Sequence, residues 1–222
     1  MAQYNRVQVI NQIKESGMIP LFYHPKIEVA KAVLKACYDG GARLIEFTNR
    51  GDFAIDIFTE LIRYSISELP GMIIGVGSVT DASAASQYML YGANFIVTPV
   101  FREDIAVICN RRKVLWIAGC GSLNEITVAE ERGCELVKLF PGNTYGPDFV
   151  KSVKAPQPWT SIMPTGGVTI EKKNLTDWFD AGVTCVGLGS KLISEEILVK
   201  KDYDILRVRV AEVLDMIEKI RS

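Results

Sequence analysis

The sequence has 222 residues, of which 48% are hydrophobic and 23% are charged, and its formal net charge is -1. This composition suits one soluble globular domain over residues 1–222 with a large core. The near-neutral charge offers no basic face, so we expect no nucleic-acid partner and no membrane partner, and no apolar run is as long as a membrane span.

Apolar residues recur at helical and strand spacings in a regular order along the chain. After an opening helix at 4–16, the predicted strand and helix pairs are 18–22 with 28–38, 42–47 with 53–69, 72–76 with 82–91, 94–98 with 103–112, 114–118 with 123–132, 135–140 with 147–153, 161–163 with 172–179, and 184–188 with 204–220. Strands that alternate strictly with helices form a parallel sheet with the helices outside it. Eight such units in this length predict an α/β fold, a small single-domain (β/α)8 TIM barrel with an N-terminal helix.

An open doubly wound sheet is the alternative fold. It usually carries a glycine-rich phosphate loop after its first strand, and here that strand is followed by Tyr23, His24, Pro25 and Lys26. No linker, low-complexity tract or domain boundary interrupts residues 1–222. The sequence therefore favours the barrel.

Cysteine and histidine usage predicts the compartment and limits metal chemistry. The five cysteines are scattered and odd in number, and none forms a C-x-x-C pair. The N-terminus lacks the apolar core of a signal peptide, so we expect a cytoplasmic protein with reduced thiols. The single histidine, His24, excludes a metal site built on several imidazoles.

Residues 135–142 predict a buried strand that is apolar apart from its ends and Lys138. A lysine is almost never fully buried without a partner or a chemical role. Loss of water disfavours the charged ammonium, and the neutral amine is a nucleophile that can form a Schiff base with a carbonyl. The alternative is a lysine at the strand edge whose amine reaches solvent.

Glu46 ends the second predicted strand, and in a barrel the active site lies at the C-terminal ends of the strands. Strands two and six are opposite each other, and alternate strands contribute to one layer of inward side chains. Glu46 and Lys138 are therefore predicted to face each other, and the carboxylate could shuttle protons for Schiff-base chemistry. The alternative is an ion pair without chemistry.

Further polar residues and glycines fall at the same mouth. The planar fork of Arg50 suits a substrate carboxylate, and Ser78 could donate to the same group; the alternatives are a solvated arginine and a plain turn serine. Loops after strands seven and eight are frequent phosphate sites in barrels. The candidates there are Thr165, Gly166, Gly167, Gly189 and Ser190, with ordinary tight turns as the alternative.

Six segments together resemble the 2-keto-3-deoxy-6-phosphogluconate (KDPG) / 4-hydroxy-2-oxoglutarate (KHG) aldolase family, which are class I lysine aldolases on a (β/α)8 barrel. They run in the family order and cover nearly the whole chain. The set is highly specific, although each segment alone is weak. The segments are 41–50, 74–79, 92–99, 135–141, 164–167 and 186–190.

The resemblance implies an aldehyde lyase of the Entner-Doudoroff type of carbohydrate metabolism, which cleaves a 2-keto-3-deoxy sugar acid into pyruvate and an aldehyde. It implies Lys138 as the Schiff-base lysine and Glu46 as the general acid and base. It also implies a homotrimer, a small keto-acid substrate and no cofactor or metal. The substrate-binding residues it implies are Arg50, Ser78 and Thr165 at the pyruvate-derived carboxylate and Gly166, Gly167, Gly189 and Ser190 at the phosphate, with Pro99 and Phe140 as further contacts.

The chain departs from the family pattern in ways that affect the substrate more than the Schiff-base chemistry. Asn49 and Gly51 stand where leucine and threonine are common, which we expect to loosen the loop behind Arg50. The remaining departures are Ser78 for threonine, Gly142 for alanine, Lys191 for tryptophan, and Ala118-Gly119 for a Pro-Gly pair.

Three functional alternatives stay open at this point. The first is the same cleavage of an unphosphorylated keto acid or of the galactonate-derived epimer. The second is a metal-dependent aldolase, which the single histidine disfavours. The third is a phosphosugar-binding barrel without catalysis, which would form no covalent adduct with pyruvate.

Overall fold

The computed structural model describes residues 2–222. Eight strands form one sheet in the order β7-β6-β5-β4-β3-β2-β1-β8, and every neighbouring pair is parallel. The strands are β1 (Met18–Phe22), β2 (Leu44–Thr48), β3 (Ile73–Gly77), β4 (Phe95–Val97), β5 (Leu115–Cys120), β6 (Leu136–Leu139), β7 (Ile162–Pro164) and β8 (Val186–Leu188).

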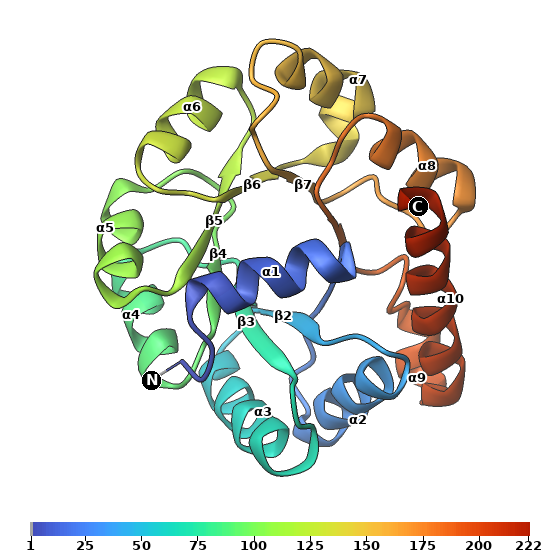
Figure 1. Cartoon of the computed structure of the whole chain (residues 1–222). Coiled ribbons are helices and arrows are strands. Elements are labelled where there is room, and N and C mark those ends of the chain that lie inside the picture. The colour runs from blue at the N-terminus through green and yellow to red at the C-terminus, as the bar shows by residue number, and fades with distance from the viewer. Residues whose placement is uncertain (1) are drawn as a thin grey trace.

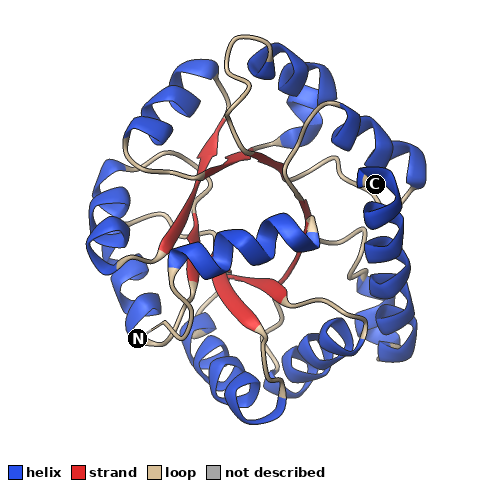
Figure 2. Cartoon of the chain, in the orientation of Figure 1, coloured by secondary structure: helices blue, strands red, loops and turns tan. Residues whose placement is uncertain are grey.

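The two end strands of this sheet meet, so the sheet closes into a barrel. Thr165 and Gly187 form a parallel bridge between the ends of β7 and β8. Below them, the Thr184 amide donates a hydrogen bond of 2.9 Å to the Ile162 carbonyl. Figure 2 shows the ring of strands with the helices outside it. The predicted (β/α)8 barrel is confirmed, and the open sheet is excluded.

The helices also follow the predicted series, with element ends within two residues of their predicted positions apart from two differences. The first is α7, which begins at Gly142 because a first turn precedes a kink at Gly146. The second is α9, a six-residue helix that Ser194 caps and that is too short for apolar periodicity to predict. The helices are α1 (Arg6–Ser16), α2 (Ile27–Asp39), α3 (Ala54–Glu68), α4 (Ala82–Leu90), α5 (Glu103–Arg112), α6 (Leu123–Glu131), α7 (Gly142–Lys154), α8 (Lys172–Asp180), α9 (Glu195–Lys200) and α10 (Tyr203–Arg221).

Helix α1 lies across the end of the barrel where the strands begin (Figure 1). Asn5 starts it with a capping box, in which the Asn5 and Gln8 side chains each accept a hydrogen bond from the other residue's amide. Gly17 ends it in a left-handed conformation, with φ 67°. Val9 and Ile13 are fully buried in the apolar cluster that fills the barrel interior. This helix therefore seals the N-terminal end of the barrel.

The helices of residues 2–222 include none with the length and apolar character needed to cross a membrane.

All five cysteines are free thiols buried in the core. Burial raises the pKa of Cys37, Cys109 and Cys134 to about 12, and it also raises the pKa of Cys120 and Cys185. Because the thiolate is the reactive form, we expect a disulfide reagent such as Ellman's reagent to modify none of them in the folded protein at pH 8. All five should react after denaturation. Rapid modification of the native protein would contradict this inertness.

Candidate active site

The register of the barrel determines which inward side chains lie at the same height. From Glu46, the paired positions on β3, β4 and β5 lead to Cys134 before β6. Continued from Cys134 through β7, β8 and β1, the register returns to β2 at a position eight residues before Glu46. This offset of eight is the shear of a TIM barrel. Strand β6 lies halfway around the barrel from β2, so half of that offset applies there, and this is the spacing between Cys134 and Lys138. Glu46 and Lys138 therefore lie at the same height on opposite strands.

Both side chains point into the barrel. Leu44 and Leu136 belong to the interior cluster, and residues two positions further along a strand face the same side. Glu46 is 1% exposed and Lys138 is 6% exposed. The alternative of a lysine that reaches solvent is therefore wrong.

Glu46 and Lys138 do not form an ion pair within 4.0 Å in the described part of the chain. Oε2 of Glu46 is buried and accepts no hydrogen bond from residues 2–222. The Lys138 Nζ atom lies 5.2 Å from the centre of the Phe140 ring, within range of a cation–π contact. The Glu46 carboxylate oxygen and the Lys138 amine are therefore both available to interact with a bound ligand.

Glycines at inward positions make room for polar side chains in and above this layer. A Cβ on Gly77 would overlap the Glu46 carboxylate, and a Cβ on Gly187 would overlap the Thr165 hydroxyl. Large apolar residues instead fill the barrel nearer its N-terminal end, including Phe95 and Met163. The interior is thus filled by large apolar side chains at one end and by polar side chains beside glycines toward the other, where the strands end.

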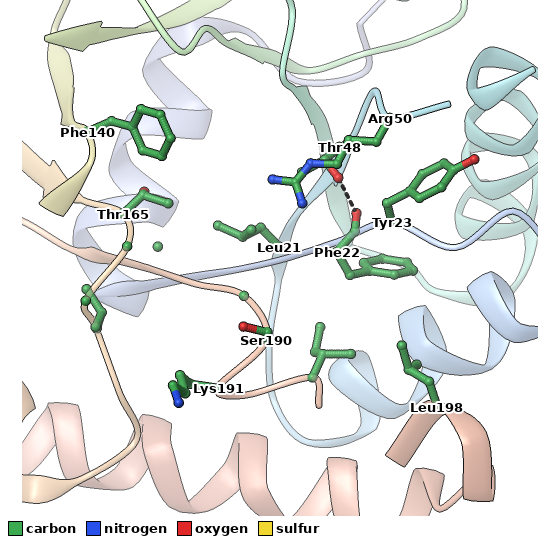
Figure 3. Close-up of a pocket in the computed structure, with 16 residues that line it drawn as sticks. Leu21, Phe22, Tyr23, Thr48, Arg50, Phe140, Thr165, Ser190, Lys191 and Leu198 are labelled. Atoms are coloured by element: carbon green, nitrogen blue, oxygen red, sulfur yellow. Dashed lines mark hydrogen bonds between the residues drawn. The ribbon is translucent and has the colours of Figure 1, made fainter. Parts of the chain in front are cut away.

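A cavity of about 450 Å³ opens at that mouth (Figure 3). Its lining contains seven of the predicted site residues: Arg50, Phe140, Thr165, Gly166, Gly167, Gly189 and Ser190. Ser78 and Pro99 follow the ends of β3 and β4 but do not line this cavity. The structure therefore gathers the predicted substrate residues that follow β2, β6, β7 and β8 at one site. Glu46 and Lys138 do not line this cavity and lie in the buried layer of the barrel.

Two cations stand on different sides of the cavity (Figure 3). Arg50 follows β2 and Lys191 follows β8, and both are exposed. Within residues 2–222, neither side chain forms an ion pair. Such unpaired cations can attract a ligand that carries a negative charge at each end.

The turns after β7 and β8 present backbone donors to the cavity. The N–H groups of Gly166, Gly167, Gly189 and Ser190 donate to no backbone carbonyl in the described chain. Gly166 and Gly167 have φ of 86° and 74°, which L side chains rarely adopt. Successive free N–H groups of this kind form a concave site for an anion.

The loop that carries Arg50 lies close to a tyrosine on each side of this residue. Tyr88 of α4 donates a hydrogen bond of 2.8 Å to the side-chain oxygen of Asn49. Gly51 has φ 89°, and a Cβ there would lie 2.8 Å from the Tyr23 hydroxyl oxygen. Asn49 and Gly51 thus each lie against a tyrosine, and the expected loosening of this loop stays a prediction.

Comparison with known proteins agrees with this arrangement. A family model described as KDPG and KHG aldolase matches residues 9–208. The chain belongs to the KDPG and KHG aldolase family. The 2-dehydro-3-deoxy-phosphogluconate aldolase of Dickeya dadantii is 30% identical over 196 residues, which cover 87% of this chain and 89% of that protein. The 2-dehydro-3-deoxy-6-phosphogalactonate aldolase of Escherichia coli is 33% identical over 121 residues, which cover 54% of this chain and 58% of that protein.

Solved structures of KDPG aldolases share the barrel. One from Legionella pneumophila, with pyruvate captured as a covalent carbinolamine, has a TM-score of 0.84 and 24% identity and covers 92% of this chain and 97% of its own. That match establishes the fold. Because members of the KDPG and KHG aldolase family are aldolases, and aldolases are lyases, this chain is a lyase.

Sequence reasoning missed three polar residues that line the cavity of this aldolase. Thr48 lines it two positions after Glu46, so strand alternation could have indicated it. Tyr23 follows β1 directly, where no motif marked it. Lys191 was noted only as a departure from the family pattern, and its place at the cavity comes from the turn after β8.

Proposed function

We propose that this chain is a class I aldolase that reversibly cleaves 2-keto-3-deoxy-6-phosphogluconate, or a close phosphorylated 2-keto-3-deoxy sugar acid, into pyruvate and glyceraldehyde 3-phosphate. One observation carries the proposal. Glu46 and Lys138 lie in one buried layer of the barrel, and the cavity at the mouth above this layer is lined by two cations without an ion pair, Arg50 and Lys191. No metal or organic cofactor takes part in this chemistry.

The first step is formation of an imine at Lys138. Its amine attacks the C2 ketone, and the ketone oxygen leaves as water, so that a protonated imine joins the substrate to the lysine. Arg50 and Thr165 hold the C1 carboxylate, since Arg50 has a free guanidinium and the Thr165 hydroxyl oxygen is buried without a partner among residues 2–222.

Carbon–carbon cleavage uses Glu46 as the base. Glu46 takes the proton of the C4 hydroxyl, the C3–C4 bond breaks, and its electron pair moves through C2 to the iminium nitrogen to give an enamine. The C4 oxygen becomes the carbonyl of the departing aldehyde. Glu46 then returns its proton to C3, and water hydrolyses the imine to release pyruvate and regenerate the Lys138 amine.

The phosphate of the substrate lies at the turns after β7 and β8. The free N–H groups of Gly166, Gly167, Gly189 and Ser190 supply the donors, and Lys191 adds a positive charge beside them. This arrangement supports a dianion at the end of the substrate away from the carboxylate.

A panel of aldol cleavages, each coupled to pyruvate detection, tests the proposed substrate. It compares 2-keto-3-deoxy-6-phosphogluconate, its galactonate epimer and 4-hydroxy-2-oxoglutarate. The highest kcat/KM is expected for a phosphorylated sugar acid. A higher value for 4-hydroxy-2-oxoglutarate would replace the proposed substrate with this small keto acid, and no pyruvate from any of them would support a binding barrel.

Lys191→Met is expected to lower kcat/KM for the phosphorylated substrate about fivefold, because a partly solvated ion pair contributes on the order of 1 kcal/mol. The value for 4-hydroxy-2-oxoglutarate should change much less, since this substrate carries no phosphate. Lys14→Met, which changes an exposed lysine of α1 at the other end of the barrel, is the matched control. Equal losses on both substrates would contradict a role for Lys191 at the phosphate.

A cytoplasmic homotrimer, which the family resemblance implies, stays part of the proposal. Sedimentation of the purified protein measures the oligomeric state directly.

A further inference from the structure

We infer that Tyr88 and Asn49 are positioning residues, which hold the loop of Arg50 so that its guanidinium meets the substrate carboxylate. The inference rests on the proposed role of Arg50. Tyr88 belongs to α4, 39 positions from Asn49 in the sequence, and its hydroxyl donates to the Asn49 side-chain oxygen at 2.8 Å. The family commonly has leucine where this chain has Asn49, and leucine could not accept that hydrogen bond.

The side chain of Arg50 depends on its backbone for its place. In the described part of the chain, the guanidinium makes no side-chain hydrogen bond and no ion pair. Its backbone is held by one bond to β3, in which the Asn49 amide donates to the Gly77 carbonyl at 2.8 Å, and by one local bond, in which the Arg50 amide donates to the Thr48 carbonyl at 2.9 Å. The loop conformation therefore decides where the guanidinium can reach.

That loop needs an outside attachment, because its own backbone conformation is unfavourable. Gly51 has φ 89°, which glycine adopts without strain. Phe53 has φ 59°, and a bulky residue such as phenylalanine rarely adopts this region. Phe53 is also 78% exposed, so packing contributes little to holding it. The contact from Tyr88 to Asn49 opposes relaxation of the segment.

Tyr88 is suited to hold the loop because it is itself fixed. It is 3% exposed, and its ring packs edge-on against Phe58 of α3 with 5.0 Å between ring centres. Burial raises the pKa of Tyr88 to about 12, so the hydroxyl keeps its proton and remains a donor at neutral pH. The attachment thus joins the loop to the packed core between α3 and α4.

The test measures pyruvate binding as the concentration that half-saturates borohydride trapping at Lys138, and it measures KM and kcat for cleavage. Tyr88→Phe removes the donor, Asn49→Leu removes the acceptor, and each is expected to raise the half-saturating concentration and KM about 3- to 10-fold, as for loss of one hydrogen bond. The trapping rate at saturation and kcat should change little. The double variant should lose no more than the single variants, since both break the same contact.

Tyr38→Phe is the matched control, because Tyr38 donates a similar hydrogen bond of 2.9 Å to the Pro70 carbonyl far from the cavity. If Tyr88→Phe and Asn49→Leu lower thermal stability as Tyr38→Phe does but leave KM and pyruvate binding unchanged, the contact is structural and the inference is overturned. Arg50→Ala separates the two levels of the argument. If Arg50→Ala binds pyruvate as well as the native protein, the role of Arg50 and the inference are both overturned. If Arg50→Ala binds pyruvate more weakly but Tyr88→Phe and Asn49→Leu do not, only the inference is overturned.

Discussion

Replacing Lys138 with alanine is expected to reduce aldol cleavage to the uncatalysed background. In the proposed mechanism, the lysine amine supplies the imine that accepts the electron pair of the broken carbon–carbon bond. The buried layer around it offers no second amine, since its neighbours at this height are Glu46, Val97 and Gly187. Pyruvate and borohydride together should add one reduced pyruvyl group to the native protein. Mass spectrometry of the digested protein should place it at Lys138.

The same experiment contains its control. The Lys138→Ala protein should fold with an unchanged far-ultraviolet dichroism spectrum and take up no pyruvyl group. Lys191, which also lies at the cavity, is the obvious competing amine. An adduct at Lys191 or Lys113 in the native protein would move the Schiff base away from the buried layer and contradict the proposed mechanism.

Glu46→Gln is expected to lower kcat by about 10²- to 10⁴-fold, the usual range for loss of a general acid or base. Glutamine keeps the size of the side chain, so the layer stays filled, but it can neither take the C4 proton nor return it to C3. Imine formation should persist, so trapping by borohydride separates this loss from a loss of Lys138. Steady-state cleavage kinetics with trapping measured in parallel would check it.

Two further variants sharpen the assignment to Glu46. Glu135→Gln removes a carboxylate whose ion pair with Arg6 lies at the start of β6, and it should leave cleavage unchanged. Gly77→Ala leaves Glu46 in the sequence but places a methyl group where its carboxylate lies, so it should reproduce much of the loss in kcat. Near-normal turnover in Glu46→Gln would reduce this residue to a structural role.

The barrel could be predicted from sequence because its units repeat. Eight apolar strands, each followed by a helical pattern, leave few topologies, and Lys138 is conspicuous inside one of those strands. Its position opposite Glu46 also follows from topology, since opposite strands of a closed barrel face each other. These predictions depend on local periodicity and on one global rule, both of which the sequence carries.

The contacts between loops could not be predicted in this way. The hydrogen bond from Tyr88 to Asn49 joins a buried face of α4 to the loop after β2, one strand earlier in the chain, and no spacing encodes it. The close fit of Gly51 against Tyr23 depends on the left-handed backbone of the loop, and the sequence alone indicates a looser one. The place of Lys191 beside the cavity likewise depends on how the turn after β8 folds back.

Helix α1 leaves one exit for the two products of the proposed cleavage. It closes the end of the barrel where the strands begin, so the aldehyde and pyruvate share the mouth through which the substrate arrived. In the proposed mechanism, the aldehyde is free to diffuse away while the three-carbon fragment is still covalently attached to Lys138. Departure is therefore sequential, aldehyde first and pyruvate last. In the direction of synthesis the order reverses, and pyruvate must be charged onto the enzyme before the aldehyde arrives.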